Sequence, residues 1–236
     1  MKRFILLLFV CSLCCPALCG GFDKYVLKPL DYRGVHLKGE LLRQFEETEA
    51  FYYGLSDDYL LYPFRVRAGL PAPGGSMGGV YAGHGPFGQF LSGYARAYAA
   101  TGDEKYKEKA LLLMNEWGRT IDPSGYGFPL KDGFLVAYQY DKLMGGLADV
   151  YHYCGAREAK AYMDRITEWA EKNIPRDKTY CDVTGAMTGE WYTLSENLYR
   201  AYLFTGDERY RRFAEVWEYD EYWDEVASGD WNSIYS

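Results

Sequence analysis

Apolar residues recur at helical spacing on both sides of a short motif that occurs three times in the chain. Before the first copy, Phe87, Leu91, Tyr94 and Tyr98 follow one another at intervals of three or four residues, and the same spacing continues after it. The other two copies are flanked in the same way. No stretch alternates between apolar and polar residues over the length of a strand, so the pattern predicts an all-α fold of helical hairpins.

The repeated motif predicts the corner of each hairpin. Its copies are Thr101-Gly102-Asp103, Cys154-Gly155-Ala156 and Thr205-Gly206-Asp207, which lie about fifty residues apart. Glycine adopts the left-handed conformation that ends a helix, and an aspartate can cap the next one. This period is too long for tetratricopeptide hairpins of about 34 residues. It suits an (α/α)6 barrel, a ring of six hairpins, of which the chain would hold three as an incomplete ring.

Two segments before the first hairpin complete the secondary-structure prediction. Residues 40–53 carry apolar side chains on one side, which predicts one further helix. Pro63 and the proline- and glycine-rich run Leu70–Gly79 disfavour helix and predict a long loop. The loop lacks the Gly-Lys-Ser/Thr ending of a phosphate-binding loop.

Residues 1–20 have the pattern of a secretory signal peptide. Two basic residues precede an apolar run, Phe4–Leu18, that is too short to span a bilayer. Cleavage would leave Gly20 or Gly21 as the first residue of a secreted protein. A lipid anchor on Cys19 is the alternative, although the large leucine before it fits such processing poorly.

Composition narrows the class of partner. The net charge is −7 and no basic cluster occurs, which excludes nucleic acid as the partner. After the signal peptide the sequence has no further apolar run long enough for a predicted membrane span. Beyond the signal peptide only Cys154 and Cys181 remain, and spacing alone does not show whether they pair. The chain holds 24 Tyr and 6 Trp, whose rings suit both helix packing and stacking on sugars.

Polar residues gather where the first helix of each hairpin begins, which would be the mouth of such a barrel. The candidates for binding sugar hydroxyls there are His84, Gln89, Tyr138, Asp141, Glu190 and Asn197. Each also has a structural interpretation. His84 and Gln89 can bind local backbone instead, and Asp141 can compensate the positive end of a helix.

Glu190 is the better placed carboxylate for chemistry. Glu190, Thr193 and Asn197 lie at i, i+3 and i+7, which predicts one shared helical face, whereas Glu196 is expected to pair with Arg200. Glycoside hydrolysis needs two carboxyl groups roughly 5 to 10 Å apart, and the sequence offers no convincing second one. Scattered histidines without HExxH or CxxC spacing predict no metal site, and no Gly-x-Ser-x-Gly elbow occurs.

Three runs resemble the N-terminal half of the β-L-arabinofuranosidase family, glycoside hydrolase family 127. They are Phe87–Asp103, Tyr140–Asp149 and Glu190–Tyr202. The resemblance implies that residues 21–236 are the N-terminal part of an (α/α)6-barrel catalytic domain that removes terminal arabinofuranose from plant glycans or glycoproteins. It also implies a zinc-held cysteine nucleophile and assisting glutamates, all expected downstream of Ser236, so that this chain by itself would bind no cofactor and be inactive.

The runs also depart from the family pattern. Gly85 and Gln89 stand where the family often has the histidines of a Gly-His-x-x-Gly-His-Tyr-Leu-Ser motif, and Asp141 stands where some members carry histidine. These changes indicate a divergent subgroup. Two other functions stay open: a non-catalytic helical-repeat module that binds glycans or protein, and a polysaccharide lyase on the same barrel, which the negative charge of the chain disfavours for acidic sugars.

Overall fold

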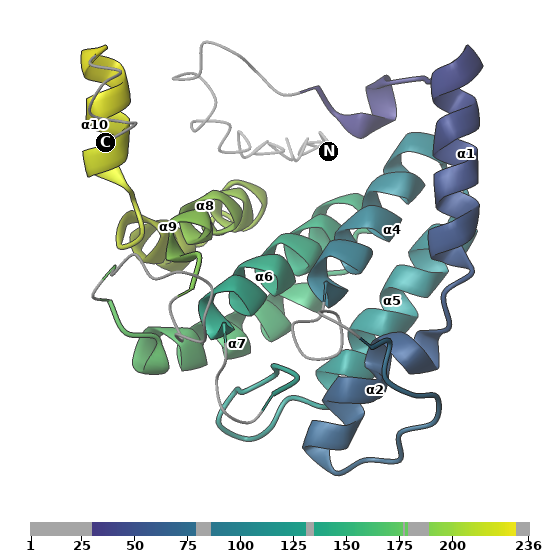
Figure 1. Cartoon of the computed structure of the whole chain (residues 1–236), viewed down its shortest axis with the longest axis horizontal. Coiled ribbons are helices and arrows are strands. Elements are labelled where there is room, and N and C mark those ends of the chain that lie inside the picture. Colours follow the sequence, from purple (N-terminus) through teal and green to yellow (C-terminus); the bar gives the residue numbers. More distant parts are fainter. Residues whose placement is uncertain (1–29, 79–85, 131–134, 177, 179–188, 230–236) are drawn as a thin grey trace, which may run out of the picture.

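A computed structural model of the chain describes residues 30–78, 86–130, 135–176, 178 and 189–229, and within them it contains helices and no strand (Figure 1). The predicted all-α class is confirmed. The first helices of the three predicted hairpins are α4 (Phe87–Thr101), α6 (Val136–Tyr153) and α8 (Leu194–Thr205). The second helices are α5 (Glu104–Gly118), α7 (Ala159–Asn173) and α9 (Glu208–Glu215).

The helices form two layers. Helices α4, α6 and α8 pack side by side as an inner layer, and α5, α7 and α9 lie outside them (Figure 1). The inner helices run parallel, because Gly88 at the start of α4 meets Lys142 of α6, whereas Ser92, further along α4, meets Asp149, further along α6. The arrangement is an arc of a ring, and all three inner helices begin at the same end. We call that end the mouth.

The corners form as the repeated motif predicts. Gly102 has a φ of 71°, and the Thr101 hydroxyl donates to the Ala97 carbonyl at 2.7 Å while accepting from the Asp103 N–H at 3.1 Å. The Asp103 carboxylate then caps α5 by accepting from the Lys105 N–H at 3.1 Å. The third corner repeats each of these bonds, and the middle corner keeps its left-handed glycine at a φ of 70°.

Aromatic rings fill much of the space between the two layers. Three buried rings form a row: the Phe64 and Phe87 centroids lie 5.0 Å apart, and the Phe87 and Trp117 centroids lie 6.3 Å apart. The Trp117 indole N–H donates to the Gly127 carbonyl at 2.9 Å, so the polar edge of the ring is satisfied inside the core. Core packing therefore accounts for a large share of the aromatic content.

Helix α1 (Gly39–Tyr53) confirms the prediction for residues 40–53, but the prediction for Pro63 is wrong. Pro63 lies inside α2 (Asp57–Ala68). An internal proline costs about 3 kcal/mol, whereas burying side chains such as Leu61 and Phe64 contributes about 1.5–3 kcal/mol each. These two side chains are 0% and 1% exposed, so their burial in the core outweighs the cost of the proline. The loop after α2 is free of helix, as predicted, where it is described.

The remaining elements lie at the two edges of the arc. The short helix η2 (Tyr32–Gly34) packs on α4, and η3 (Trp191–Thr193) leads into α8. Helix α10 (Asp220–Ser228) follows α9 and, like α1, contains no buried residue. Throughout the described part of the chain, every helix is too short or too polar to cross a membrane. The predicted signal peptide, His84 and Cys181 lie outside the described residues.

Candidate functional site

The structure gathers most of the predicted site residues at the mouth. Gln89 is exposed on α4, Tyr138 and Asp141 lie on α6, and Asn197 lies on α8. Glu190 directly precedes η3, which continues into α8. Because the inner helices are parallel and adjacent, these positions share one end of the arc (Figure 1).

Asp141 and Asn197 bind each other directly. Asp141 Oδ1 accepts from Asn197 Nδ2 at 2.8 Å, and Asp141 Oδ2 accepts from Lys142 Nζ at 2.8 Å. Asp141 is 1% exposed, whereas 19% of the Lys142 side chain is exposed. Asp141 lies more than one turn inside α6, so the prediction that it compensates a helix terminus is wrong. Lys142 and Asn197 are partly exposed, so the cluster reaches the surface through these two side chains.

Burial and charge set the protonation of the Asp141–Lys142 pair. Burial raises the pKa of Asp141 above its ordinary value, although Lys142 and Asn197 both favour the carboxylate. Burial also disfavours the Lys142 ammonium, but the Asp141 carboxylate outweighs it and raises the pKa of Lys142. The ammonium lies 4.8 Å from the centre of the Tyr138 ring. Lys142 therefore stays a charged donor at neutral pH, supported by a carboxylate and an aromatic face.

Glu190 does not share a helical face with Asn197, and that prediction is wrong. Its φ is 58°, in the left-handed region, and its carbonyl accepts from both the N–H and the hydroxyl of Thr193, at 3.1 Å and 3.0 Å. The chain turns here because the next residue, Trp191, enters the core and is 3% exposed. The Glu190 carboxylate nevertheless lies close enough to favour the charged form of Lys142.

A second polar cluster, the Asp149 network, joins the three inner helices below the mouth. The Asp149 carboxylate is 0% exposed and accepts from the Ser92 hydroxyl, from Arg96 Nε at 2.7 Å and from the Arg200 guanidinium. Arg200 Nη1 also donates to Asn197 Oδ1 at 2.7 Å. Since Asn197 in turn binds Asp141, the network holds the mouth cluster in a fixed position.

The sequence carries a signal for this network that our interpretation missed. The tripeptide Arg-Ala-Tyr occurs at residues 96–98 and again at 200–202, each time placing an arginine within an apolar helical pattern. A charge in such a position needs a buried partner, and Asp149 supplies one for both arginines. The predicted pair between Glu196 and Arg200 is therefore wrong, because the Arg200 guanidinium binds Asp149 of the neighbouring helix α6 instead.

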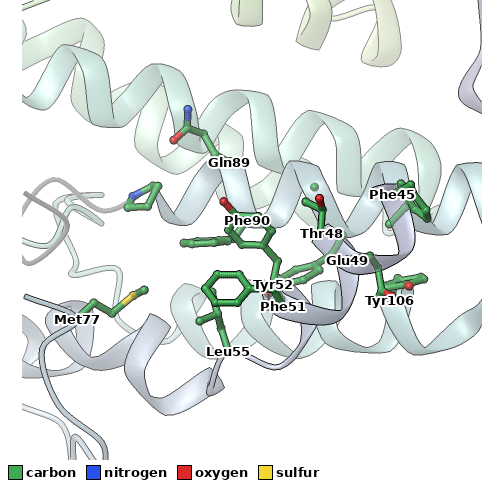
Figure 2. Close-up of a pocket in the computed structure, with 14 residues that line it drawn as sticks. Phe45, Thr48, Glu49, Phe51, Tyr52, Leu55, Met77, Gln89, Phe90 and Tyr106 are labelled. Atoms are coloured by element: carbon green, nitrogen blue, oxygen red, sulfur yellow. Dashed lines mark hydrogen bonds between the residues drawn. The ribbon is translucent and has the colours of Figure 1, made fainter. Parts of the chain in front are cut away.

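A groove of 710 Å³ lies between α1 and α4, away from the Lys142 cluster. Figure 2 shows that aromatic side chains, among them Phe51, Tyr52 and Phe90, fill its floor. Of the predicted site residues, Gln89 alone lines it, and the Gln89 amide points away from Tyr52 and Phe90. The groove is apolar, so it is not the polar site that the sequence predicts.

The described residues do not fit a zinc-bound cysteine nucleophile. They contain no group of three His, Cys, Asp or Glu side chains placed to hold a metal. Cys154 is a buried free cysteine, and burial raises the pKa of its thiol to about 12, which keeps it protonated. Zinc in a longer protein stays an expectation from the family resemblance.

The comparisons with known proteins agree with the fold. A family model described as the β-L-arabinofuranosidase GH127 catalytic domain matches residues 34–233. The chain belongs to glycoside hydrolase family 127. The resemblance of the three sequence runs is thereby confirmed, and the three hairpins are part of the family's helical barrel.

One solved structure shows the same fold. It is a GH127 β-L-arabinofuranosidase from Geobacillus stearothermophilus T6, with a TM-score of 0.54 and 17% sequence identity. The match covers 73% of the present chain and 28% of that enzyme, so the chain spans less than a third of its length. A comparison with curated proteins gives no match.

Proposed function

We propose that the chain is part of a secreted glycoside hydrolase that removes terminal β-L-arabinofuranose, or a related sugar, from plant-type glycans. The observation that carries the proposal is the family match over residues 34–233. The polar cluster at the mouth supports it, because a partly exposed lysine whose ammonium lies beside an aromatic ring suits a sugar with its hydroxyls and apolar face.

The mouth residues divide into two roles. Lys142 donates hydrogen bonds to sugar hydroxyls, Tyr138 offers a ring face, and Glu190 accepts from hydroxyls at the rim. Asp141 and Asn197 position these groups, because the contacts within the cluster already use both Asp141 oxygens and both ends of the Asn197 amide. This division assigns positioning to the residues whose hydrogen-bonding groups are already occupied and binding to the other residues of the mouth.

Cleavage requires groups that the described residues do not supply. The two-carboxylate mechanisms need a pair of carboxyl groups roughly 5 to 10 Å apart on either side of the bond. Asp141 is buried in its ion pair, which leaves Glu190 without such a partner at the described mouth. We therefore place the residues that cleave the bond in a longer protein, of which this chain supplies the first half of the ring.

Kinetics on the gene product extended past Ser236 test the proposal. We expect cleavage of an aryl β-L-arabinofuranoside, and Lys142→Met should raise KM by about tenfold or more, since a hydrogen bond to a charged group contributes about 1.5–3 kcal/mol. Lys172→Met is the matched control, because Lys172 forms an exposed ion pair on α7. Release of unsaturated uronates from acidic polymers, with no arabinofuranosidase activity, would contradict the proposal in favour of a lyase.

Secretion has its own test. Expression of the intact gene in its native type of cell, followed by N-terminal sequencing of the exported protein, should give Gly20 or Gly21 as the first residue. A lipid-modified Cys19 at the N-terminus would show an anchored protein instead, and an uncleaved Met1 inside the cell would contradict export.

A further inference from the structure

Aromatic side chains form a continuous row across η3 and the start of α10. The Tyr192 and Tyr219 ring centroids lie 6.5 Å apart with planes 30° apart, and the Tyr219 and Tyr222 centroids lie 5.5 Å apart with planes 28° apart. Trp223 meets the Tyr222 ring edge-on at 5.1 Å. We call Tyr192, Tyr219, Tyr222 and Trp223 the aromatic platform.

The platform rests on the core but does not belong to it. Trp191, which is 3% exposed, supports it from below through an edge-on contact of 5.0 Å with Tyr219. Above this contact, Tyr192 is 40% exposed, Tyr222 is 38% exposed and Trp223 is 62% exposed. A contiguous exposed patch of large aromatic rings marks an interaction surface rather than ordinary surface composition.

The charges around the platform narrow the class of ligand. Helix α10 interleaves its rings with carboxylates, Asp220, Glu221 and Asp224, all of which are exposed. Aromatic faces suit the C–H faces of sugar rings, and carboxylates accept hydrogen bonds from sugar hydroxyls. One ammonium, that of Lys178, lies 5.7 Å from the supporting Trp191 ring, and the more numerous carboxylates repel uronates and other acidic chains. The surface is therefore suited to a neutral oligosaccharide.

The position of the platform relates it to the mouth. Tyr192 follows Glu190 by two residues, and η3 leads directly into the inner helix α8. We propose that the aromatic platform binds a neutral oligosaccharide and holds sugar units beyond the terminal one at Lys142. This inference rests on the proposed function for the site at Lys142, and it adds a second place of contact on the same glycan.

Binding of sugars of different length tests the inference. Calorimetry on the full-length gene product gives the dissociation constants of arabinose and of arabinotetraose. The constant for arabinose divided by that for arabinotetraose should fall about threefold to tenfold in Trp223→Ala and in Tyr192→Ala, because each variant removes one ring that stacks on the longer sugar. Tyr59→Ala is the matched control, since Tyr59 is 46% exposed on α2 and should leave the ratio unchanged.

Three outcomes would overturn the inference. An unchanged ratio in both platform variants would show that longer sugars do not reach the platform. Choline binding that is tighter than arabinotetraose binding and lost in Trp223→Ala would assign the surface to a cation instead. If acrylamide does not quench the part of the tryptophan emission that is lost in Trp223→Phe, another part of the protein covers the platform. A platform-dependent ratio without arabinofuranosidase activity would refute the proposed function while leaving the platform in place.

Discussion

Replacing Asp149 with asparagine removes a buried negative charge that faces two arginines. Asp149 is 0% exposed on α6 and receives Arg96 from α4 and Arg200 from α8. Asparagine keeps the shape of the side chain, so the variant changes charge and hydrogen bonding without opening a cavity. One carboxylate oxygen of Asp149 becomes an NH2 group that faces a hydrogen-bond donor, and Arg96 and Arg200 lose their common counter-charge.

The expected cost depends on Asp149, which is 0% exposed, and on its arginines, whose side chains are 35% and 21% exposed. Breaking a fully buried ion pair by removing one partner costs about 3–5 kcal/mol, because the other charge is left uncompensated. Water partly solvates these arginines, which places the cost at the lower end, about 3 kcal/mol. For a chain of this size, 1 kcal/mol corresponds to about 2–4 °C in Tm. The variant should therefore melt about 6–12 °C below the wild type.

Thermal unfolding followed by circular dichroism measures this difference. Glu168→Gln is the control, because Glu168 pairs with Lys172 on the surface of α7, where 57% and 67% of the two side chains are exposed. Exposed pairs contribute about 0–1 kcal/mol, so the control should melt close to the wild type. A loss in Asp149→Asn no larger than in the control would refute the conclusion that the Asp149 network holds the inner helices together.

Three further predictions concern packing, pH and association. In Gly146→Ala the new Cβ would lie 2.3 Å from the Gly88 carbonyl oxygen, so chemical denaturation should show a loss of about 1–3 kcal/mol, whereas Gly93→Ala, with nothing within 4 Å, should be neutral or gain up to about 1 kcal/mol. Lys142→Met should cost more stability at about pH 7 than at about pH 3. Loss of the ammonium raises the folded-state pKa of Asp141 further above its unfolded value, which destabilises the fold at neutral pH but not below the unfolded pKa, where Asp141 is protonated in both states. Equal losses of stability at both pH values would contradict the ion pair. Expressed by itself, the chain should self-associate through exposed apolar side chains such as Leu41 and Phe51 of α1, which are 63% and 66% exposed, and a monodisperse monomer in sedimentation would contradict this.

The corners and the helices were predictable because their determinants are local. The hydroxyl of Thr101, the left-handed Gly102 and the cap at Asp103 all act within a few residues, so the motif specifies its own geometry. The amphipathic spacing around each corner then predicts which helices pair. The family resemblance added the ring, which no local feature contains.

The errors arose where distant residues decide the outcome. Pro63 is tolerated inside a helix because neighbouring side chains are buried in the core, where Phe64 packs on Phe87 of α4. Glu190 does not lie on the helical face of Asn197 because the next residue, Trp191, is buried in the core and the chain turns at Glu190. Arg200 pairs with Asp149, which lies 51 residues earlier in the chain, rather than with Glu196 one turn away. Contacts of this kind depend on the packing of the inner helices, which spacing along the chain does not describe.

The parallel inner helices also give the two ends of the arc different freedom to vary. Every described corner joins an inner helix to its outer partner at the end opposite the mouth, and at the first and third corners the bonds depend on a threonine and an aspartate. The segment that leads into α8 holds Glu190 of the mouth and carries no such motif in its sequence, whereas the segment before α6 is held by Asp122, whose carboxylate accepts from the Ser124 and Tyr126 N–H groups. Random insertions in a deep mutational library should therefore be purged at the corners and retained in the segment before α8. New sugar specificities can arise at one end of the barrel while the other end preserves the fold.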